Sequence, residues 1–190
     1  MATNIDKEVI TQQIQQWLDD VVIGLNLCPF ASTPNRNKQI RIHICDSDKE
    51  EILLQELQSE LMLIDTEPAK KLETTLLVIP YMLADFQDYN QFLDLVDALL
   101  REFEWEGDFQ IASFHPQYRF AGTTLNDSEN LTNRSPYPIL HIIREASLDA
   151  ALTHYTEPEK IPAQNIIRME SLSEAEKKQL FPYLFKLEIH

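Results

Sequence analysis

The stretch QIASFHPQYRFAGTTLNDSENLTNRSPYPILHII, residues 110–143, decides how the chain folds around its candidate functional region. It begins with QIASF and ends with PILHII, two short apolar runs that predict strands. The middle, residues 117–135, has no sustained helical or alternating period, and irregular connections of this length are usually either functional or disordered. Its density of aromatic residues is unusual for a disordered segment. We therefore predict an ordered loop that builds a site, and we call residues 113–136 the long loop.

Outside the long loop, helical and strand-like patterns alternate. Apolar residues three and four apart predict an opening helix that ends near Gly24, with Asn4 or Asp6 as its cap, and the polar run 32–39 predicts a loop. Strands are predicted at IRIHIC (40–45), TTLLVIP (74–80), FQIASF (109–114) and YPILHIIRE (137–145). Helices with capping boxes are predicted at 47–64 (Ser47 and Glu50) and at 173–185 (Ser173 and Glu176). Two more helices are predicted at 84–105, capped by Asp85, and at 147–155, capped by Ser147. The run NIIRM (165–169) fits either element.

The order of these elements predicts the fold class. Strands that alternate with helices of this length favour βαβ crossovers and a sheet with parallel pairs. We predict an α/β (or α+β) fold, with a mixed sheet of four or five strands and helices packed on it; a ferredoxin-like two-layer sandwich is the alternative. At 190 residues the chain can bury a sizeable core. No linker or repeat divides it, so we expect a single domain, residues 1–190.

Composition excludes several classes of function. The chain is 44% hydrophobic and 25% charged, as soluble proteins are, and lacks an apolar run of about 18 residues that could cross a membrane. The N-terminus has no secretory signal, so a cytoplasmic location is expected. The net charge of −15 repels nucleic acid and anionic membranes. Three glycines and no Gly-rich phosphate loop exclude a Rossmann or P-loop cofactor site.

Cys28 is one of two cysteines, which without a secretory signal are expected to be reduced thiols. Because Pro29 favours the first position of a helix, Cys28 can occupy an N-cap, where the helix dipole lowers a thiol pKa and favours a nucleophile. The alternative is a buried apolar thiol in the turn after the first helix.

Two histidines lie on the strands that flank the long loop. His115 precedes Pro116 at a strand end, where it can face a pocket or satisfy backbone groups in the turn. His141 shares a face with Ile139 and Ile143, and it is either a hydrogen-bonded core residue or part of the site.

Polar and basic residues of the same region can bind an anion. Arg134, beside Asn133, can hold a carboxylate or phosphate in two-point fashion, or can tie the loop to Asp127 or Glu129. Arg144 either reaches solvent or pairs with an anion. The candidate catalytic residues are Cys28 and His115, and the candidate substrate-binding residues are Arg119, Asn133, Arg134, His141 and Arg144.

Two more specific constellations are weakly indicated. A metal site would have to recruit Cys28, His115 and His141, but no close-spaced ligand pair supports it, so we expect no metal. A nucleophilic set of Cys28, His115 and Asn133 is chemically reasonable, yet nothing in the sequence fixes their distances.

Three strings occur together in a fixed order: VIGLNLCPFA (22–31), SFHPQYRFAG (113–122) and TNRSPYPILHIIRE (132–145). In them the chain resembles family fourteen-fifteen of the domains of unknown function, over about residues 17–168. The resemblance implies a soluble, intracellular bacterial protein. It supplies no activity, cofactor or catalytic residue.

Three hypotheses of function remain open. The first is an enzyme that acts on a small anionic metabolite where the Cys28 turn meets the long loop, with His115 as general acid or base and Arg134 and Arg144 holding the anion. The second is a non-catalytic module that binds a small molecule or a protein. The third gives the loop a purely structural role. A lowered Cys28 pKa would favour the enzyme over the module.

Overall fold

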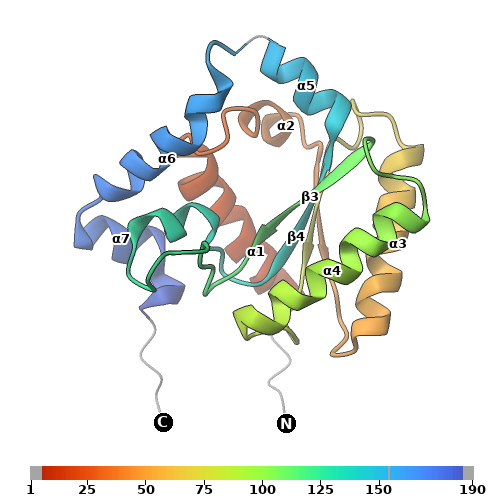
Figure 1. Ribbon diagram of the computed structural model, residues 1–190, viewed down its shortest axis with the longest axis horizontal. Coiled ribbons are helices and arrows are strands. Elements are labelled where there is room, and N and C mark those ends of the chain that lie inside the picture. Colours follow the sequence, from red (N-terminus) through yellow and green to blue (C-terminus); the bar gives the residue numbers. More distant parts are fainter. Residues whose placement is uncertain (1–5, 154, 186–190) are drawn as a thin grey trace.

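The computed structural model describes residues 6–153 and 155–185, and its centre is a four-stranded sheet (Figure 1). The strands are β1 Ile40–Ile44, β2 Thr74–Val78, β3 Phe109–Phe114 and β4 Ile139–Arg144. Each falls within a segment that the sequence predicts as a strand. Their order across the sheet is β1-β2-β4-β3. The predicted mixed sheet is therefore confirmed.

The pairing explains why two helices cover the same face. β1 and β2 are parallel, whereas β4 is antiparallel to both β2 and β3. Strands β1, β2 and β3 thus run in one direction, and β4 is inserted between the last two. The crossover helices are α3 Glu50–Thr66 and α4 Phe86–Glu102. Since such crossovers share one hand, successive ones in the same direction place their helices on one side, as Figure 1 shows for α3 and α4.

The core beneath α3 and α4 is built from one face of each helix. Its buried helical residues are Leu53, Leu57, Leu61 and Ile64 from α3, and Tyr89, Phe92, Val96 and Leu100 from α4. All five residues of β2 are buried, because helices lie on both sides of this strand. The hydroxyl of Tyr89 donates to the carbonyl of Ile139 (2.7 Å), which joins α4 to the inserted strand.

The opposite face is covered by segments from both ends of the chain. Helix α1 Lys7–Trp17 continues as wider π-helical turns, η1 Leu18–Ile23. Its residues Ile10, Ile14 and Trp17 pack with Leu76, Val78 and Ile139 of the sheet. Helices α6 Ile161–Glu170 and α7 Glu174–Leu180 complete this side. Two helical layers therefore enclose the sheet, and the two-layer ferredoxin-like alternative does not describe the chain.

Short elements connect these layers. They are α2 Ser32–Arg36, the 3-10 helix η2 Ser128–Asn133, α5 Glu145–Thr153, and the single turns η3 Pro158–Lys160 and η4 Pro182–Leu184. Of the helices in the described parts of the chain, none has the length and apolar character needed to cross a bilayer.

Most predicted helices and caps are confirmed. Asp6 caps α1, while the alternative cap, Asn4, lies outside the described residues. Asp85 caps α4, and Ser173 with Glu176 forms the capping box of α7. The ambiguous run NIIRM is helical, as part of α6.

Three local predictions are wrong. Residues 32–36 form α2 within the predicted loop. Ser47 and Glu50 form no capping box, because α3 begins only at Glu50 and the Ser47 hydroxyl instead accepts from the backbone N–H of Lys49 (3.1 Å). Helix α5 begins at Glu145, so Ser147 lies inside it; His154 in the predicted 147–155 helix is outside the described residues.

Candidate functional site

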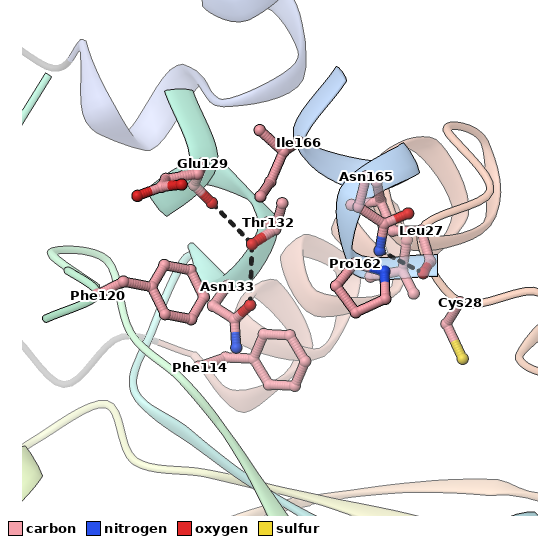
Figure 2. Close-up of a pocket in the computed structure, with 11 residues that line it drawn as sticks. Leu27, Cys28, Phe114, Phe120, Glu129, Thr132, Asn133, Pro162, Asn165 and Ile166 are labelled. Atoms are coloured by element: carbon pink, nitrogen blue, oxygen red, sulfur yellow. Dashed lines mark hydrogen bonds between the residues drawn. The ribbon is translucent and has the colours of Figure 1, made fainter. Parts of the chain in front are cut away.

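A cavity of about 580 Å3 lies beside the carboxyl end of β3, on the face of the sheet that α1 covers. Its walls come from three distant segments of the chain (Figure 2). They are Val22 of η1 with Leu27 and Cys28 of the turn that follows, Phe114, Phe120, Glu129, Thr132 and Asn133 from β3 and the long loop, and Pro162, Asn165 and Ile166 from α6. The Cys28 turn and the long loop therefore meet in space, which the site hypothesis requires.

Cys28 lines the cavity but does not cap a helix. Helix α2 begins at Ser32, so Pro29 is not a first helical residue and the expected N-cap geometry is wrong. The backbone N–H groups of Phe30 and Ala31 bond to the half-buried thiol and favour its thiolate, but burial has the larger effect and raises the Cys28 pKa above its ordinary value. The thiol is therefore a weaker nucleophile than predicted.

His115 is fully buried and uses both ring nitrogens. Nε2 donates to the carbonyl of Leu83 (3.0 Å), and Nδ1 accepts the backbone N–H of Gln117 (2.9 Å). The ring packs against Phe86 and Tyr89 of α4, with centroids 5.4 and 5.1 Å away. Burial lowers its pKa, so the neutral form is favoured. These contacts hold the turn before α4 against the end of β3.

The sheet separates His115 from Cys28. Successive side chains of a strand point to opposite faces. Phe114 packs in the core of α1 and lines the cavity, whereas the next residue, His115, packs under α4. The structure brings Cys28 and Asn133 to one cavity and does not bring His115 to it. The set Cys28, His115 and Asn133 is not assembled.

Asn133 joins the long loop to the end of β3 while it lines the cavity. Its Nδ2 donates to the carbonyl of Ser113 (3.1 Å), and its own carbonyl accepts the backbone N–H of His115 (3.1 Å). The Thr132 hydroxyl lies 3.0 Å from Asn133 Oδ1 and 2.7 Å from the carbonyl of Glu129. The amide is thus fixed in orientation at the cavity wall.

Arg134 ties the long loop to itself. Its Nε donates to the carbonyl of Tyr118 (3.3 Å) and its Nη2 to that of Leu125 (2.8 Å). Partial burial lowers its pKa. Within the described chain no ion pair joins it to Asp127 or Glu129, the carboxylates expected as partners, and it is not among the cavity's lining residues. Backbone carbonyls hold this guanidinium.

Arg144 closes the end of helix α3. Its guanidinium donates to the carbonyls of Ile64, Glu67 and Leu72 and lies over the ring of Phe109 (5.9 Å to the centroid). The last carbonyls of a helix have no partner within it, and a cation there also complements the helix dipole. Backbone carbonyls under the other face of the sheet thus hold Arg144, which does not line the cavity, and anion binding by this residue stays a prediction.

His141 and Arg119 also lie away from the cavity lining. His141 Nε2 donates to the Thr74 hydroxyl (2.6 Å), which donates in turn to the carbonyl of Ile142 (2.5 Å). Burial lowers the His141 pKa to about 4. Its ring is 6.2 Å from that of Phe114, so it stands behind the cavity wall. Arg119 is exposed to solvent.

The sequence reasoning missed the wall that α6 contributes. Asn165 Nδ2 donates to the carbonyl of Leu27 (2.8 Å), which fastens α6 to the Cys28 turn, and Ile166 supplies an apolar surface beside it. The ambiguous NIIRM run contains both residues, but no local pattern relates this run to Cys28. Thr132 was missed as well, because threonine carries no specific signal.

Charge in the cavity is sparse. Of the described residues that line it, only Glu129 carries a full charge, and Figure 2 shows this carboxylate directed away from the other lining side chains. Among the residues described, no group of three or more His, Cys, Asp or Glu side chains could hold a metal ion. The cavity thus presents mainly apolar surface with the polar groups of Thr132, Asn133 and Asn165.

Fold and cavity define an α/β protein with a mixed sheet and a mainly apolar cavity beside one strand end. The sequence model of a family described as a protein of unknown function (DUF1415) matches residues 9–179, and the chain belongs to this family. No curated protein and no solved structure matches the chain.

Proposed function

We propose that this protein is a non-catalytic module that binds a small uncharged molecule in the cavity. The observation that carries the proposal is the cavity lining, in which apolar side chains surround a few oriented amides. A volume of about 580 Å3 suits a small ligand. Ligands of α/β sheets commonly bind outside the carboxyl ends of strands, which is where Phe114 ends β3.

The positions of the basic side chains favour an uncharged ligand over the small anionic metabolite of the first hypothesis. Arg134 and Arg144 donate to backbone carbonyls, and Arg119 is exposed and does not line the cavity. The net charge of −15 also repels anions from the surface. An anion entering the cavity would lose its hydration without gaining a cationic partner from the lining.

The state of Cys28 favours binding over catalysis. A nucleophilic thiol needs a lowered pKa or a neighbouring base. Burial raises the Cys28 pKa, and His115, the expected base, packs under α4 on the other face of the sheet. A structural role for part of the long loop is supported as well, since Arg134 ties the loop together, whereas the cavity lining supports binding.

We propose further that the protein is bacterial and cytoplasmic, as the resemblance implies. Cys28 and Cys45 are free thiols, which suits a reducing compartment. The acidic composition favours a small molecule over nucleic acid as partner.

A fluorescent apolar amine, 1-aminoanthracene, tests the binding function. It is uncharged at neutral pH, and its emission rises in an apolar site. We expect saturable 1:1 binding to the unmodified protein. In Ile166→Phe, a larger side chain occupies the cavity, and the affinity should fall about tenfold or more. Ile167→Phe is the matched control, because Ile167 is the next residue of α6, is 64% exposed and does not line the cavity.

The result is interpretable only if both variants fold, which their melting temperatures establish. Equal affinity in the two variants, or no saturable binding to the unmodified protein, would overturn the proposed function.

A further inference from the structure

We infer that the cavity selects an uncharged, planar aromatic ring that carries an amide-like edge, such as an aromatic carboxamide or a neutral lactam-type heterocycle. This inference rests on the proposed function and adds the chemical class of the ligand. Phe114 and Phe120 supply the surface for the ring, and Asn133 and Asn165 supply partners for its polar edge.

Both phenylalanine rings are held in place by a second aromatic residue outside the cavity lining. Phe114 packs edge-on against Trp17, with centroids 5.3 Å apart and planes at 73°. Phe120 packs edge-on against Tyr118, at 4.9 Å and 63°. Trp17 is itself anchored, since its Nε1 donates to the carbonyl of Arg134 (3.0 Å). Because Phe114 and Phe120 are already held in place, they lose little conformational freedom when a ligand binds. An aromatic ligand would also gain the favourable energy of ring–ring contacts.

The two amides are anchored but not saturated. An asparagine amide offers two N–H donors and an acceptor oxygen with two lone pairs. One N–H of Asn133 donates to the carbonyl of Ser113, and one N–H of Asn165 donates to the carbonyl of Leu27. Among the described residues, no hydrogen bond uses the second N–H of either amide or the Oδ1 of Asn165. The free N–H groups can donate to a C=O of a ligand and the free oxygen of Asn165 can accept from its N–H, and these are the two polar groups of an amide.

Electrostatics set the charge of this ligand. Among the described residues, the lining includes no Lys, Arg or His side chain, and its carboxylate, Glu129, is directed away from the other lining side chains (Figure 2). A carboxylate or phosphate on the ring would enter without a cation to balance it. An uncharged amide needs only the hydrogen bonds that the asparagines offer.

Four small probes separate the features of this ligand. Benzamide has the ring and the amide, ethylbenzene only the ring, cyclohexanecarboxamide only the amide, and benzoate the ring with a negative charge. The chain has two tryptophans, and Trp105 lies in the core under α4. In Trp105→Phe the emission therefore reports on Trp17 beside Phe114. We expect benzamide to change this emission and to bind about tenfold or more tightly than each other probe.

If Trp105→Phe does not fold, calorimetry on the unmodified protein measures the same order of affinities.

A second variant locates the amide contact. Asn165→Leu should weaken benzamide about tenfold and leave ethylbenzene unchanged. Its control is Gln164→Leu on the exposed side of α6, which should affect neither.

Failure of the inference and failure of the proposed function are distinguishable. If ethylbenzene or benzoate binds as tightly as benzamide, the inference is overturned while 1-aminoanthracene binding still supports the cavity. If benzamide is not bound but 1-aminoanthracene is, the inference is again overturned. If neither binds, both proposals fall.

Discussion

The two faces of the sheet differ in how they are covered. Under α3 and α4, side chains from two crossover helices fill the space above β2, and the helical core residues are at most 7% exposed. On the α1 face, the cover is assembled from the first helix, the long loop and α6, and the cavity remains between them. The segments that meet around this cavity come from distant parts of the chain, and together they leave a mainly apolar space beside the end of β3.

The same contrast explains the fates of the candidate site residues. His115 and Arg144 lie under the α3 and α4 face, where both serve the packing of the fold. Cys28 and Asn133 lie on the cavity face, where they line the proposed site. Substitutions on the two faces should therefore affect different properties.

The largest effect is expected in the core under α3. Leu57 is 0% exposed, and Leu57→Ala leaves a void that the two crossover helices cannot easily close. The free energy of unfolding should therefore fall by about 3 kcal/mol. Ile166→Ala on the cavity wall should cost about 1 kcal/mol, because this side chain already borders open space. Chemical denaturation of both variants measures the difference. Equal losses would contradict the contrast between the faces.

Arg144→Met should be the next most damaging. It removes the donor to the carbonyls of Ile64, Glu67 and Leu72, and the loss of charged hydrogen bonds at a helix end costs about 2–3 kcal/mol. The control is Arg101→Met, an exposed arginine near the end of α4, with an expected loss of about 0.5 kcal/mol or less. Thermal and urea unfolding compare the two. A loss in Arg144→Met no larger than in the control would show that the helix end is satisfied without it.

His141 makes the stability of the cavity face depend on pH. Its folded pKa is about 4, below the ordinary value of 6.5, so protonation favours the unfolded chain. The stabilisation is complete above pH 6.5 and is lost as pH falls toward 4. Between pH 7 and pH 5 the unmodified protein should lose about 2 kcal/mol more than His141→Gln. Denaturation at several pH values measures this difference, in which the contributions of other groups, including His115, cancel. Parallel curves would exclude the effect.

The smallest effect on stability is expected for Cys28. Cys28→Ser should change the free energy of unfolding by about 1 kcal/mol or less, because the thiol is only half-buried.

Because burial raises the pKa of Cys28, its thiol should react with iodoacetamide more slowly at pH 7 than free cysteine does, and the rate should rise up to and beyond pH 9. Labelling followed by mass spectrometry measures it, with Cys28→Ser as the control for Cys45. Rapid labelling at pH 7 would revive the catalytic hypothesis.

Local patterns predicted the secondary structure well where one period dominated. The alternating run around His141 correctly placed Ile139 on one face and Leu140 and Ile142 on the other. Prediction failed where a weak signal competed with packing, as at Ser47, whose hydroxyl bonds two residues ahead because α3 begins later than its sequence suggests.

The candidate site was predictable as a region and not as a set of contacts. Five of its lining positions lie in the long loop that the sequence singled out, namely Phe114, Phe120, Glu129, Thr132 and Asn133, and Cys28 was named as well. Asn165 could not be found, because its bond to Leu27 joins residues 138 positions apart. The arginines were predicted to bind an anion because their side chains suit it, but backbone carbonyls can satisfy the same donors.

By itself the sequence determined the strands, most helices, the mixed α/β sheet and the region of the site, because these depend on periodicity and composition within short segments. Only the tertiary structure decided that Phe114 faces the cavity while His115 faces α4, that Cys28 is buried enough for its pKa to rise, and that α6 completes the wall. The physical reason is that the environment of a side chain is set by segments far along the chain. The same residue type can therefore bind a ligand or hold the fold, according to which segment packs against it.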